Sequence, residues 1–460
     1  MKKIILFALS TAFAVTASAE GYQVNTLSAK QLGMAHTGVS QKLNSESLWF
    51  NPAAAVFQED KFTVAAGVTG IMPVATFVGQ TSGVKTTTDN EMSTPLYFNA
   101  NYKINDDLSV GLNFNTPYGS SMSWGDSWEG AHLVQDISLA TYNAQPTISY
   151  KFMDGKLSVG AGLMIAWGSF SLSKSALPVG DMGAAVIYQS VLAGYTAAGV
   201  DTSIAEAYAT AAKTQAEAAG ENPLASVEIS GDSEVKVGVN IGALYNINDK
   251  WSIGASYRTN MMMEVTEGET AVSYYNEVMQ EILSSTTSAL EGANFSASLP
   301  LPATFTIGAT YYPTEQWTIS ADLQLTEWNT YDALNVDFVP EGAADQNAEK
   351  NYKDALAVRL GAQYDLCKSF TARAGLYYDG SPVEDDFLSP ETPSTSKLGY
   401  TCGVSIRPIS KLSIDLAYAY ISSLGGERTD CSCPCTYYGA FAGDYEATAN
   451  VVSVGLSWGF

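Results

Sequence analysis

Short stretches in which apolar and polar residues alternate fill most of the chain after about residue 60. The stretch 412–420 is one example, and its apolar positions are Leu412, Ile414, Leu416, Tyr418 and Tyr420. The same pattern recurs over 157–168 and 317–326. Because successive side chains of a β-strand point to opposite faces, a period of two predicts strands rather than helices.

The two faces of these strands differ in chemistry. One is apolar and often ends in Trp, Tyr or Phe, whereas the other carries mainly Gly, Ser, Thr and Asn with an occasional charge. Small polar residues would make a poor sandwich core, but they suit a barrel lumen whose outer face meets lipid between aromatic girdles. An open sheet edge in lipid would leave backbone groups unpaired. The pattern therefore predicts an all-β fold, a closed antiparallel transmembrane β-barrel.

Counting the alternating stretches predicts about fourteen strands, an even number of the kind that such barrels have. We place them near 61–72, 94–104, 108–116, 138–152, 157–174, 227–247, 251–265, 295–312, 317–338, 352–366, 369–379, 397–408, 411–423 and 444–460. The connections are alternately short and long. The short ones, which should be periplasmic turns, are Asn105–Asp107, Met153–Lys156, Asn248–Lys250 and Pro313–Gln316.

Two long connections, which should be external loops, have helical character. Residues 175–226 contain the Ala-rich stretch Met182–Ala219, and residues 266–294 contain Tyr274–Leu290 with apolar residues at helical spacing. Loops of this length are usually functional. We expect helical external loops that offer a landing surface for an apolar molecule.

Composition excludes several other classes. Of 460 residues, 46% are apolar and only 15% are charged, which argues against a disordered chain. Lys and Arg number 23 against 47 Asp and Glu, and the formal charge of −24 leaves no basic face for nucleic acid. No phosphate-cradling or nucleotide motif appears, so we expect no cofactor.

The N-terminal region predicts export and a plug. Met1–Ala19 has a basic start, a short apolar core and a small-residue cleavage site, which together are typical of a signal peptide. Residues 20–60 lack the membrane-strand pattern but are apolar enough to need a packing site, and the barrel lumen offers one. The alternative is a periplasmic tail that docks elsewhere. The predicted organisation is thus signal peptide 1–19, hatch or plug 20–60 and barrel 61–460.

The order of several short motifs resembles the FadL-type long-chain fatty acid transporters and their aromatic-hydrocarbon relatives. These motifs are Leu32-Gly33-Met34-Ala35, Asn51-Pro52-Ala53, Thr116-Pro117-Tyr118-Gly119, Trp128-Glu129-Gly130, Leu299-Pro300-Leu301-Pro302, Thr326-Glu327-Trp328 and Asp379-Gly380-Ser381-Pro382-Val383. Each motif alone is weak, but their order over nearly the whole mature chain is specific.

The resemblance implies a fourteen-stranded barrel in a Gram-negative outer membrane, closed by an N-terminal hatch. A hydrophobic ligand would meet a groove between the third and fourth external loops and then an inner pocket. Movement of the hatch, whose motif is Asn51, Pro52 and Ala53, would open a path. An inward kink of the third strand at Pro117, Tyr118 and Gly119 would lie beside that motif and release the ligand sideways into membrane lipid, without an energy source.

The chain departs from the fatty acid transporter where that protein has cations near the ligand carboxylate. The matching positions carry Asn335 and the uncharged run Trp167–Ser173, although Lys174 lies close. An uncharged ligand is therefore as well supported as a fatty acid. Arg258, Arg359 and Arg373 also fall on lumen-facing positions. They could bind a ligand head group, but an internal ion-pair lattice is the interpretation we favour.

Cysteine and histidine offer little chemistry. Cys431, Cys433 and Cys435 lie in the last external loop, where a local disulfide or exposed thiols fit better than a metal site, since no fourth ligand is near. His36 lies in the predicted hatch and His132 in a loop, so neither is placed for catalysis. We expect no enzyme activity and no metal.

The chain ends in Phe460, the kind of aromatic terminus that the machinery for barrel assembly reads in outer-membrane barrels. We expect a monomer in outer-membrane lipid, with a hydrophobic small molecule as ligand and no nucleic acid partner. A general porin would have an open, conducting lumen, and a surface adhesin would have a sealed lumen and protein-binding loops. The apolar 20–60 segment and the ordered motifs favour the hydrophobic transporter over both.

Overall fold

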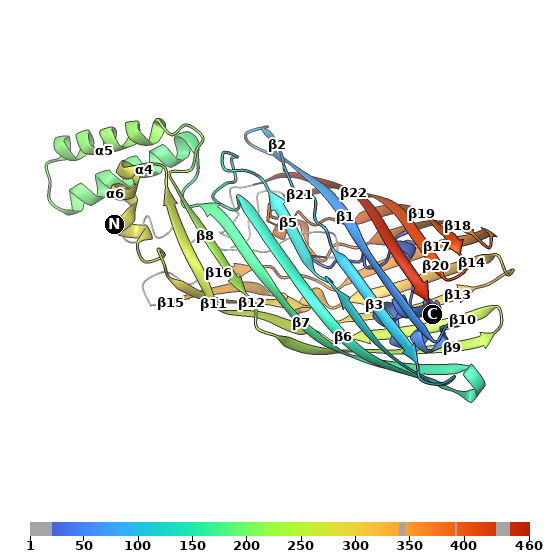
Figure 1. Ribbon diagram of the computed structural model, residues 1–460. Coiled ribbons are helices and arrows are strands. Elements are labelled where there is room, and N and C mark those ends of the chain that lie inside the picture. The colour runs from blue at the N-terminus through green and yellow to red at the C-terminus, as the bar shows by residue number, and fades with distance from the viewer. Residues whose placement is uncertain (1–20, 340–345, 392, 429–441) are drawn as a thin grey trace.

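The computed structural model describes residues 21–339, 346–391, 393–428 and 442–460. These residues form a closed antiparallel barrel of fourteen strands (Figure 1). The first strand, β1 (Phe62–Gly79), pairs with the last, β22 (Gly443–Gly459), from Thr63↔Gly459 to Gly79↔Gly443. The predicted fold class and strand number are therefore confirmed. The predicted signal peptide Met1–Ala19 and the cysteines Cys431, Cys433 and Cys435 lie outside the described residues.

Several of the fourteen strands are split into two consecutive segments. The unsplit strands are β1, β3 (Leu96–Lys103), β6 (Asp136–Phe152), β7 (Leu157–Ser175), β17 (Ala355–Cys367), β18 (Phe370–Asp379), β19 (Lys397–Ile409), β20 (Leu412–Ser423) and β22. The split strands are β4 (Leu108–Asn115) with β5 (Gly119–Ser123), β8 (Ala225–Asp232) with β9 (Lys236–Asn248), β10 (Trp251–Arg258) with β11 (Met261–Tyr274), β12 (Asn294–Leu301) with β13 (Thr304–Tyr311), and β14 (Trp317–Thr326) with β15 (Ala333–Val339). Short edge strands are β2 (Lys85–Thr87), β16 (Gln346–Glu349) and β21 (Gly426–Arg428).

The two ends of the barrel differ. Within the described residues, the connections at one end are tight, and they include the single turn η3 (Met153–Gly155) between β6 and β7. The other end, here called the helical end, carries the hairpin α4 (Gly180–Ala197) and α5 (Thr202–Glu217), and also α6 (Glu277–Thr287) (Figure 1). Both long connections are thus helical, as predicted, although the Ala-rich stretch forms two helices. Among the described residues, no helix is both long and apolar enough to span a bilayer.

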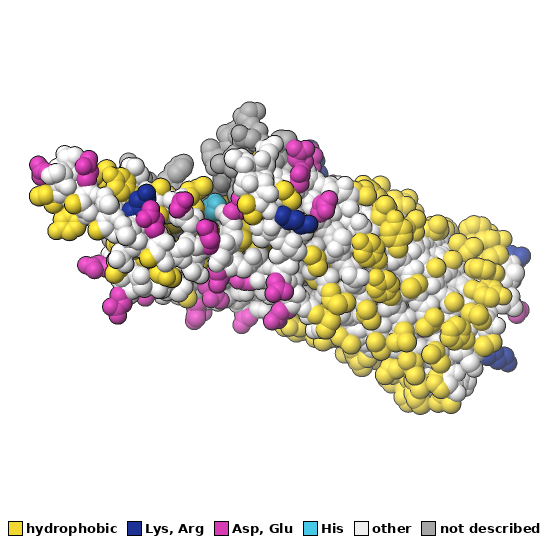
Figure 2. Space-filling view, turned by 90° about the horizontal axis from the view of Figure 1, so that it is seen from above, with side chains coloured by type: hydrophobic (Ala, Val, Ile, Leu, Met, Phe, Trp, Pro, Cys, Tyr) yellow, Lys and Arg dark blue, Asp and Glu magenta, His cyan; other side chains and the backbone are white. Residues whose placement is uncertain are grey.

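Near the tight-turn end, the apolar faces of the strands point outward. On β14, Trp317, Ile319, Leu323 and Leu325 are exposed, whereas Asp322 between them is buried. Figure 2 shows the resulting hydrophobic side chains on the visible face of this part of the barrel. Buried Asn, Ser, Thr and Gln side chains from the same strands fill the inside. A barrel in a bilayer requires an apolar outer face and can have a polar inner face.

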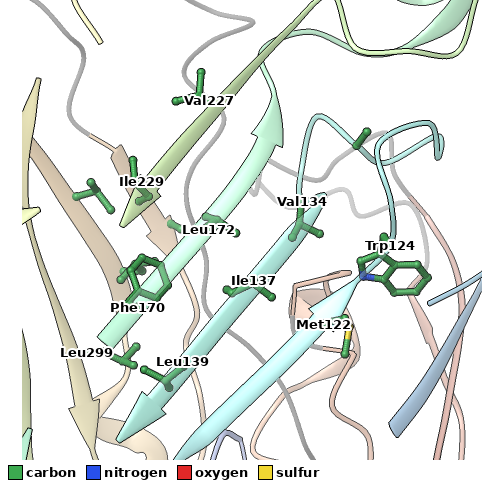
Figure 3. Close-up of a cluster of buried hydrophobic side chains, with 14 of the residues drawn as sticks. Met122, Trp124, Val134, Ile137, Leu139, Phe170, Leu172, Val227, Ile229 and Leu299 are labelled. Carbon is green, nitrogen blue, oxygen red and sulfur yellow. The ribbon is translucent and has the colours of Figure 1, made fainter. Parts of the chain in front are cut away.

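Near the helical end, the same strands turn the opposite chemistry outward. On β7, Leu163 is 48% exposed, but Phe170 and Leu172 are 6% and 0% exposed. Figure 3 shows these side chains packed inside the barrel with Ile137, Leu139, Ile229 and others. Figure 2 shows mainly polar and acidic side chains on the outside of this part. The expectation of a polar lumen is therefore wrong for this half, because strands that leave the lipid are surrounded by water and bury apolar residues inward.

Residues 21–58 lie inside the barrel rather than outside it. They form short helical turns: α2 (Ala29–Leu32), η1 (Asn44–Glu46), α3 (Ser47–Phe50) and η2 (Pro52–Phe57). Most of their side chains are buried, including Leu32, Met34 and Leu48. The lumen near the tight-turn end is therefore filled by this segment, hereafter the lumenal segment.

Candidate functional site

The Asn51-Pro52-Ala53 motif begins a helical turn on the inner wall of the barrel. Asn51 caps η2, since its Oδ1 accepts a hydrogen bond from Ala53 N at 3.0 Å, and Pro52 occupies the first helical position. The Nδ2 of Asn51 donates to the carbonyls of Val39 (2.6 Å) and of Ala243 on β9 (3.0 Å). The motif thus fixes the lumenal segment both to itself and to the wall.

Glycines in the wall let the lumenal segment approach the strands closely. A Cβ built on Gly160 of β7 would lie 2.5 Å from the carbonyl carbon of Pro52, and one on Gly242 of β9 would collide with Asn51 Oδ1. Ser149 and Ser158 on neighbouring strands donate to the carbonyls of Pro52 (2.6 Å) and Ala53 (2.8 Å). Only a residue without a side chain fits such a contact.

Two carboxylates of the wall hold other parts of the lumenal segment. Asp322 of β14 accepts hydrogen bonds through Oδ2 from the backbone N–H groups of Gly38 (2.7 Å) and Val39 (3.1 Å). Lys30 pairs with Glu46 at 2.6 Å and lies 3.6 Å from Asp415 of β20. Because these groups are shielded from water, breaking one contact leaves a polar group without a hydrogen-bond partner.

The wall itself is interrupted where β4 ends and β5 begins. Pro117 has no backbone N–H, and Tyr118 forms an isolated bridge with Gln23 while its carbonyl accepts a hydrogen bond from Thr141 N of β6 (3.0 Å). Val24 N donates to Pro117 O (2.8 Å) and Gly119 N donates to Tyr22 O (2.9 Å). The first described residues of the chain therefore bind the edge of this interruption, hereafter the wall break.

The expected neighbour of the wall break is corrected by these contacts. Asn51, Pro52 and Ala53 bind β6, β7 and β9 rather than Pro117–Gly119. The residues that contact the break are Tyr22–Val24, which the sequence analysis did not single out. Their partners lie about a hundred residues away, so no local pattern in the sequence signals the contact.

A cavity of 520 Å³ lies at the wall break. Its inner wall includes His36, Tyr377 and Asp379, which are buried in the barrel. Its outer wall includes Val74, Met92 and Leu96, which are exposed on the outside by 42%, 55% and 39%. Tyr118, Gly119 and Met122 also line it. The cavity therefore joins the interior of the barrel to its outer, apolar surface.

An aromatic cluster adjoins the wall break inside the barrel. The ring of Tyr22 stands edge-on to that of Trp328 with centroids 4.8 Å apart, and it lies 6.2 Å from Tyr118 and Tyr331. The hydroxyls of Tyr22 and Tyr118 donate to the carbonyls of Pro300 and Pro302. This cluster belongs to the apolar interior of the helical half, so a continuous apolar surface extends from that interior to the cavity.

The cations singled out in the sequence are buried, but none lines the cavity at the wall break. Arg359 donates to Gln324 (2.8 Å) and lies 4.0 Å from Asp379, whereas Arg373 donates to Gln363 (2.8 Å) and Ser405 (2.5 Å). Arg258 lies over the ring of Trp49 at 4.6 Å. Lys174 is buried at the end of β7, where Glu391 is a charged neighbour. Arg359 and Arg373 thus have the contacts of an internal polar lattice.

Comparison with known proteins supplies independent findings. The sequence model of the family described as "Outer membrane protein transport protein (OMPP1/FadL/TodX)" matches residues 10–460. A long-chain fatty acid transport protein of Escherichia coli O157:H7 is 24% identical over 87% of both chains. Two solved structures share the fold. A Pseudomonas aeruginosa FadL homologue has a TM-score of 0.75 at 17% identity, covering 96% of this chain and 100% of its own. The Pseudomonas putida toluene transporter TodX has a TM-score of 0.68 at 18% identity, and the match covers 94% of this chain and 97% of that one.

Proposed function

Because the chain belongs to the OMPP1/FadL/TodX family of outer membrane transport proteins, we propose that it carries hydrophobic small molecules passively across the outer membrane. The observation that carries the proposal is the cavity at the wall break, whose wall runs from buried lumenal residues to lipid-facing ones. A relative is named for long-chain fatty acids and a structural neighbour for toluene, so the proposed ligands are acyl chains or neutral aromatic compounds.

The proposed route follows the apolar surfaces of the molecule. A ligand enters among the helical loops and passes the apolar interior of the helical half, where Phe170 and Leu172 lie. It then reaches the cavity beside Tyr118 and leaves between the outer-wall residues Met92 and Leu96 into lipid. Each step keeps the ligand out of water, which is worth about 25 cal/mol per Å² of apolar surface. No energy source is required, because the ligand ends in lipid.

The lumenal segment acts in this proposal as a hatch. It fills the polar half of the lumen, so a ligand cannot continue straight through and is directed to the side. Residues Tyr22–Val24 bind the edge of the wall break, and their displacement would widen the opening. A general porin would instead need a continuous aqueous lumen. The proposed function is that of a channel and not of an enzyme, in keeping with the transport function of the family.

Deleting Glu20–Ala53 tests the proposal. The barrel strands are untouched, so the protein should remain folded and show the usual change in gel mobility on heating. Uptake of a radiolabelled fatty acid or toluene by cells should be lost, whereas conductance of small ions should rise because the polar lumen fills with water. Unchanged uptake by the deleted protein would contradict the assignment of the hatch.

A further inference from the structure

A short segment of chain forms one side of the opening at the wall break. Residues 89–96, hereafter the strap, lead from β2 into β3, and those from 91 to 96 line the cavity. The strap is fastened to β1, since Ile71 and Ser93 exchange two backbone hydrogen bonds (2.8 and 3.0 Å). The strap therefore continues the barrel wall toward the helical end, beyond the last pair that joins β3 to β1.

On its other side, the strap faces β5 across a seam that is fastened only at its two ends. Among the described residues, hydrogen bonds join the strap to residues 116–123 at two places. At one end Leu96 N donates to Thr116 Oγ1 (3.2 Å), and at the other Asp89 N donates to Ser123 O (2.9 Å). Since seven residues of extended chain lead from Thr116 to Ser123, the seam is roughly 20 Å long.

Asn90 bridges both sides of the seam at the end nearer the helical loops. Its Oδ1 accepts a hydrogen bond from Ser123 N of β5 (2.7 Å), and its Nδ2 donates to Pro73 O of β1 (3.0 Å). Because Ser123 N can only donate and Pro73 O can only accept, the two ends of the amide cannot be exchanged. One side chain thus ties β5 to β1 across the end of the seam.

Between its two ends, the seam is lined by small or flexible side chains. Residues 119–122 of β5, which line the cavity, are Gly, Ser, Ser and Met. On the strap side, Met92 lies against Gly70 of β1, where a Cβ would come within 2.8 Å of its Sδ. A flexible thioether can move aside for a passing molecule. The distance between the two sides is therefore limited by the fastened ends rather than by rigid bulk between them.

We propose that Asn90 is a specificity-determining residue, a clasp that keeps the two sides of the seam close and restricts lateral release to slim hydrophobic molecules. The inference rests on the proposed function and limits its substrate class by shape. Single aromatic rings and unbranched chains pass, whereas branched compounds of larger cross-section do not. Loss of the clasp leaves the strap on β1 but frees β5 from it, so the two sides can separate further.

Two probes that share a benzene ring but differ in bulk test the inference, namely toluene and 1,3,5-triisopropylbenzene. Uptake of each radiolabelled probe is measured in cells that carry the full-length protein as the only member of its family. Asn90→Ala removes both hydrogen bonds of the clasp without changing the lining of the cavity. It should raise the uptake rate of triisopropylbenzene relative to toluene by about 5- to 10-fold, as expected when hydrogen bonds that hold the closed seam are lost.

Two further variants separate the clasp from general damage to the loops. Ser123→Pro deletes the N–H that Asn90 accepts but keeps Asn90 itself, and it should shift the ratio in the same direction. Asn347→Ala is the control, because it breaks another asparagine side-chain hydrogen bond, from Nδ2 to Asn335 Oδ1 (2.9 Å), at residues that do not line the cavity. This control should leave the ratio unchanged.

The outcomes distinguish the clasp from transport itself. An unchanged ratio in Asn90→Ala and Ser123→Pro, with toluene uptake intact, would overturn the clasp and leave the transport proposal standing. Equal uptake of the two probes by the unaltered protein would also overturn it. If neither probe nor a radiolabelled fatty acid enters cells that carry the unaltered protein, the transport proposal fails and the inference fails with it.

Discussion

The two halves of strand β6 place opposite chemistry on their inner and outer faces. Toward the tight-turn end of β6, Asn143, Gln145 and Thr147 point inward and Ile148 points to lipid. Toward the helical end of the same strand, Ile137 and Leu139 point inward and Asp136 points outward. The backbone alternation continues without a break, but the chemistry of the two faces is exchanged.

The exchange shows that the solvent outside each half dictates what lies inside. Lipid outside requires apolar outer residues and leaves small polar residues for the lumen, where they hydrogen-bond the lumenal segment. Water outside requires polar outer residues and leaves apolar ones for the interior. In the proposed function, the apolar interior of the helical half receives the ligand. The polar interior of the half in lipid holds the hatch, which directs the ligand sideways.

The largest effect should come from removing an apolar side chain inside the helical half. Phe170→Ala leaves a cavity in the buried apolar cluster of Figure 3, and it should lower the free energy of unfolding by about 3–5 kcal/mol. Denaturant unfolding in detergent micelles measures this loss. Ser171→Ala alters the next, outward-facing residue and should change stability by less than about 0.5 kcal/mol. Equal effects of the two substitutions would break the comparison.

A charged residue on the outer face of the barrel should destabilise the half in lipid more than the helical half. Leu163→Arg puts a guanidinium into the lipid belt and should cost about 2–4 kcal/mol, whereas Ser171→Arg on the same face of β7 should cost about 0–1 kcal/mol. Both are measured by reversible unfolding in lipid vesicles. A penalty at Ser171 as large as that at Leu163 would mean that lipid surrounds both halves.

A smaller effect should follow from loosening the lumenal segment. Asp322→Ala removes the acceptor of two backbone N–H groups, those of Gly38 and Val39, and leaves them buried without a partner. The expected cost is about 1–3 kcal/mol. It should appear as faster proteolysis of residues 21–60 with little change in unfolding of the barrel. Protection equal to that of the unaltered protein would show that Asp322 does not secure the segment.

The fold could be predicted from the sequence because alternation is a local signal. It located fourteen strands and the short turns, and it oriented the membrane half correctly. The exchange of faces was also present in the sequence. The apolar positions of β7 change from odd numbers, ending at Trp167, to even numbers, starting at Phe170, with no residue inserted. That shift marks where the strand leaves the lipid.

The site was less predictable because its contacts join distant parts of the chain. The Asn51-Pro52-Ala53 motif owes its form to local capping, but its place on β6, β7 and β9 depends on glycines such as Gly160. The contact of Tyr22–Val24 with the wall break uses backbone groups, which have no sequence signature.

Uptake by a protein whose cavity has been filled tests most directly whether ligands leave through the wall break. Ser121 of β5 lines the cavity, whereas Ser171 of β7 does not, and both are partly exposed. Transport of toluene into lipid vesicles should fall by an order of magnitude or more in Ser121→Trp and stay unchanged in Ser171→Trp, since roughly 1.4 kcal/mol of added barrier slows a step tenfold. Undiminished transport by a folded Ser121→Trp barrel would contradict lateral release at this site.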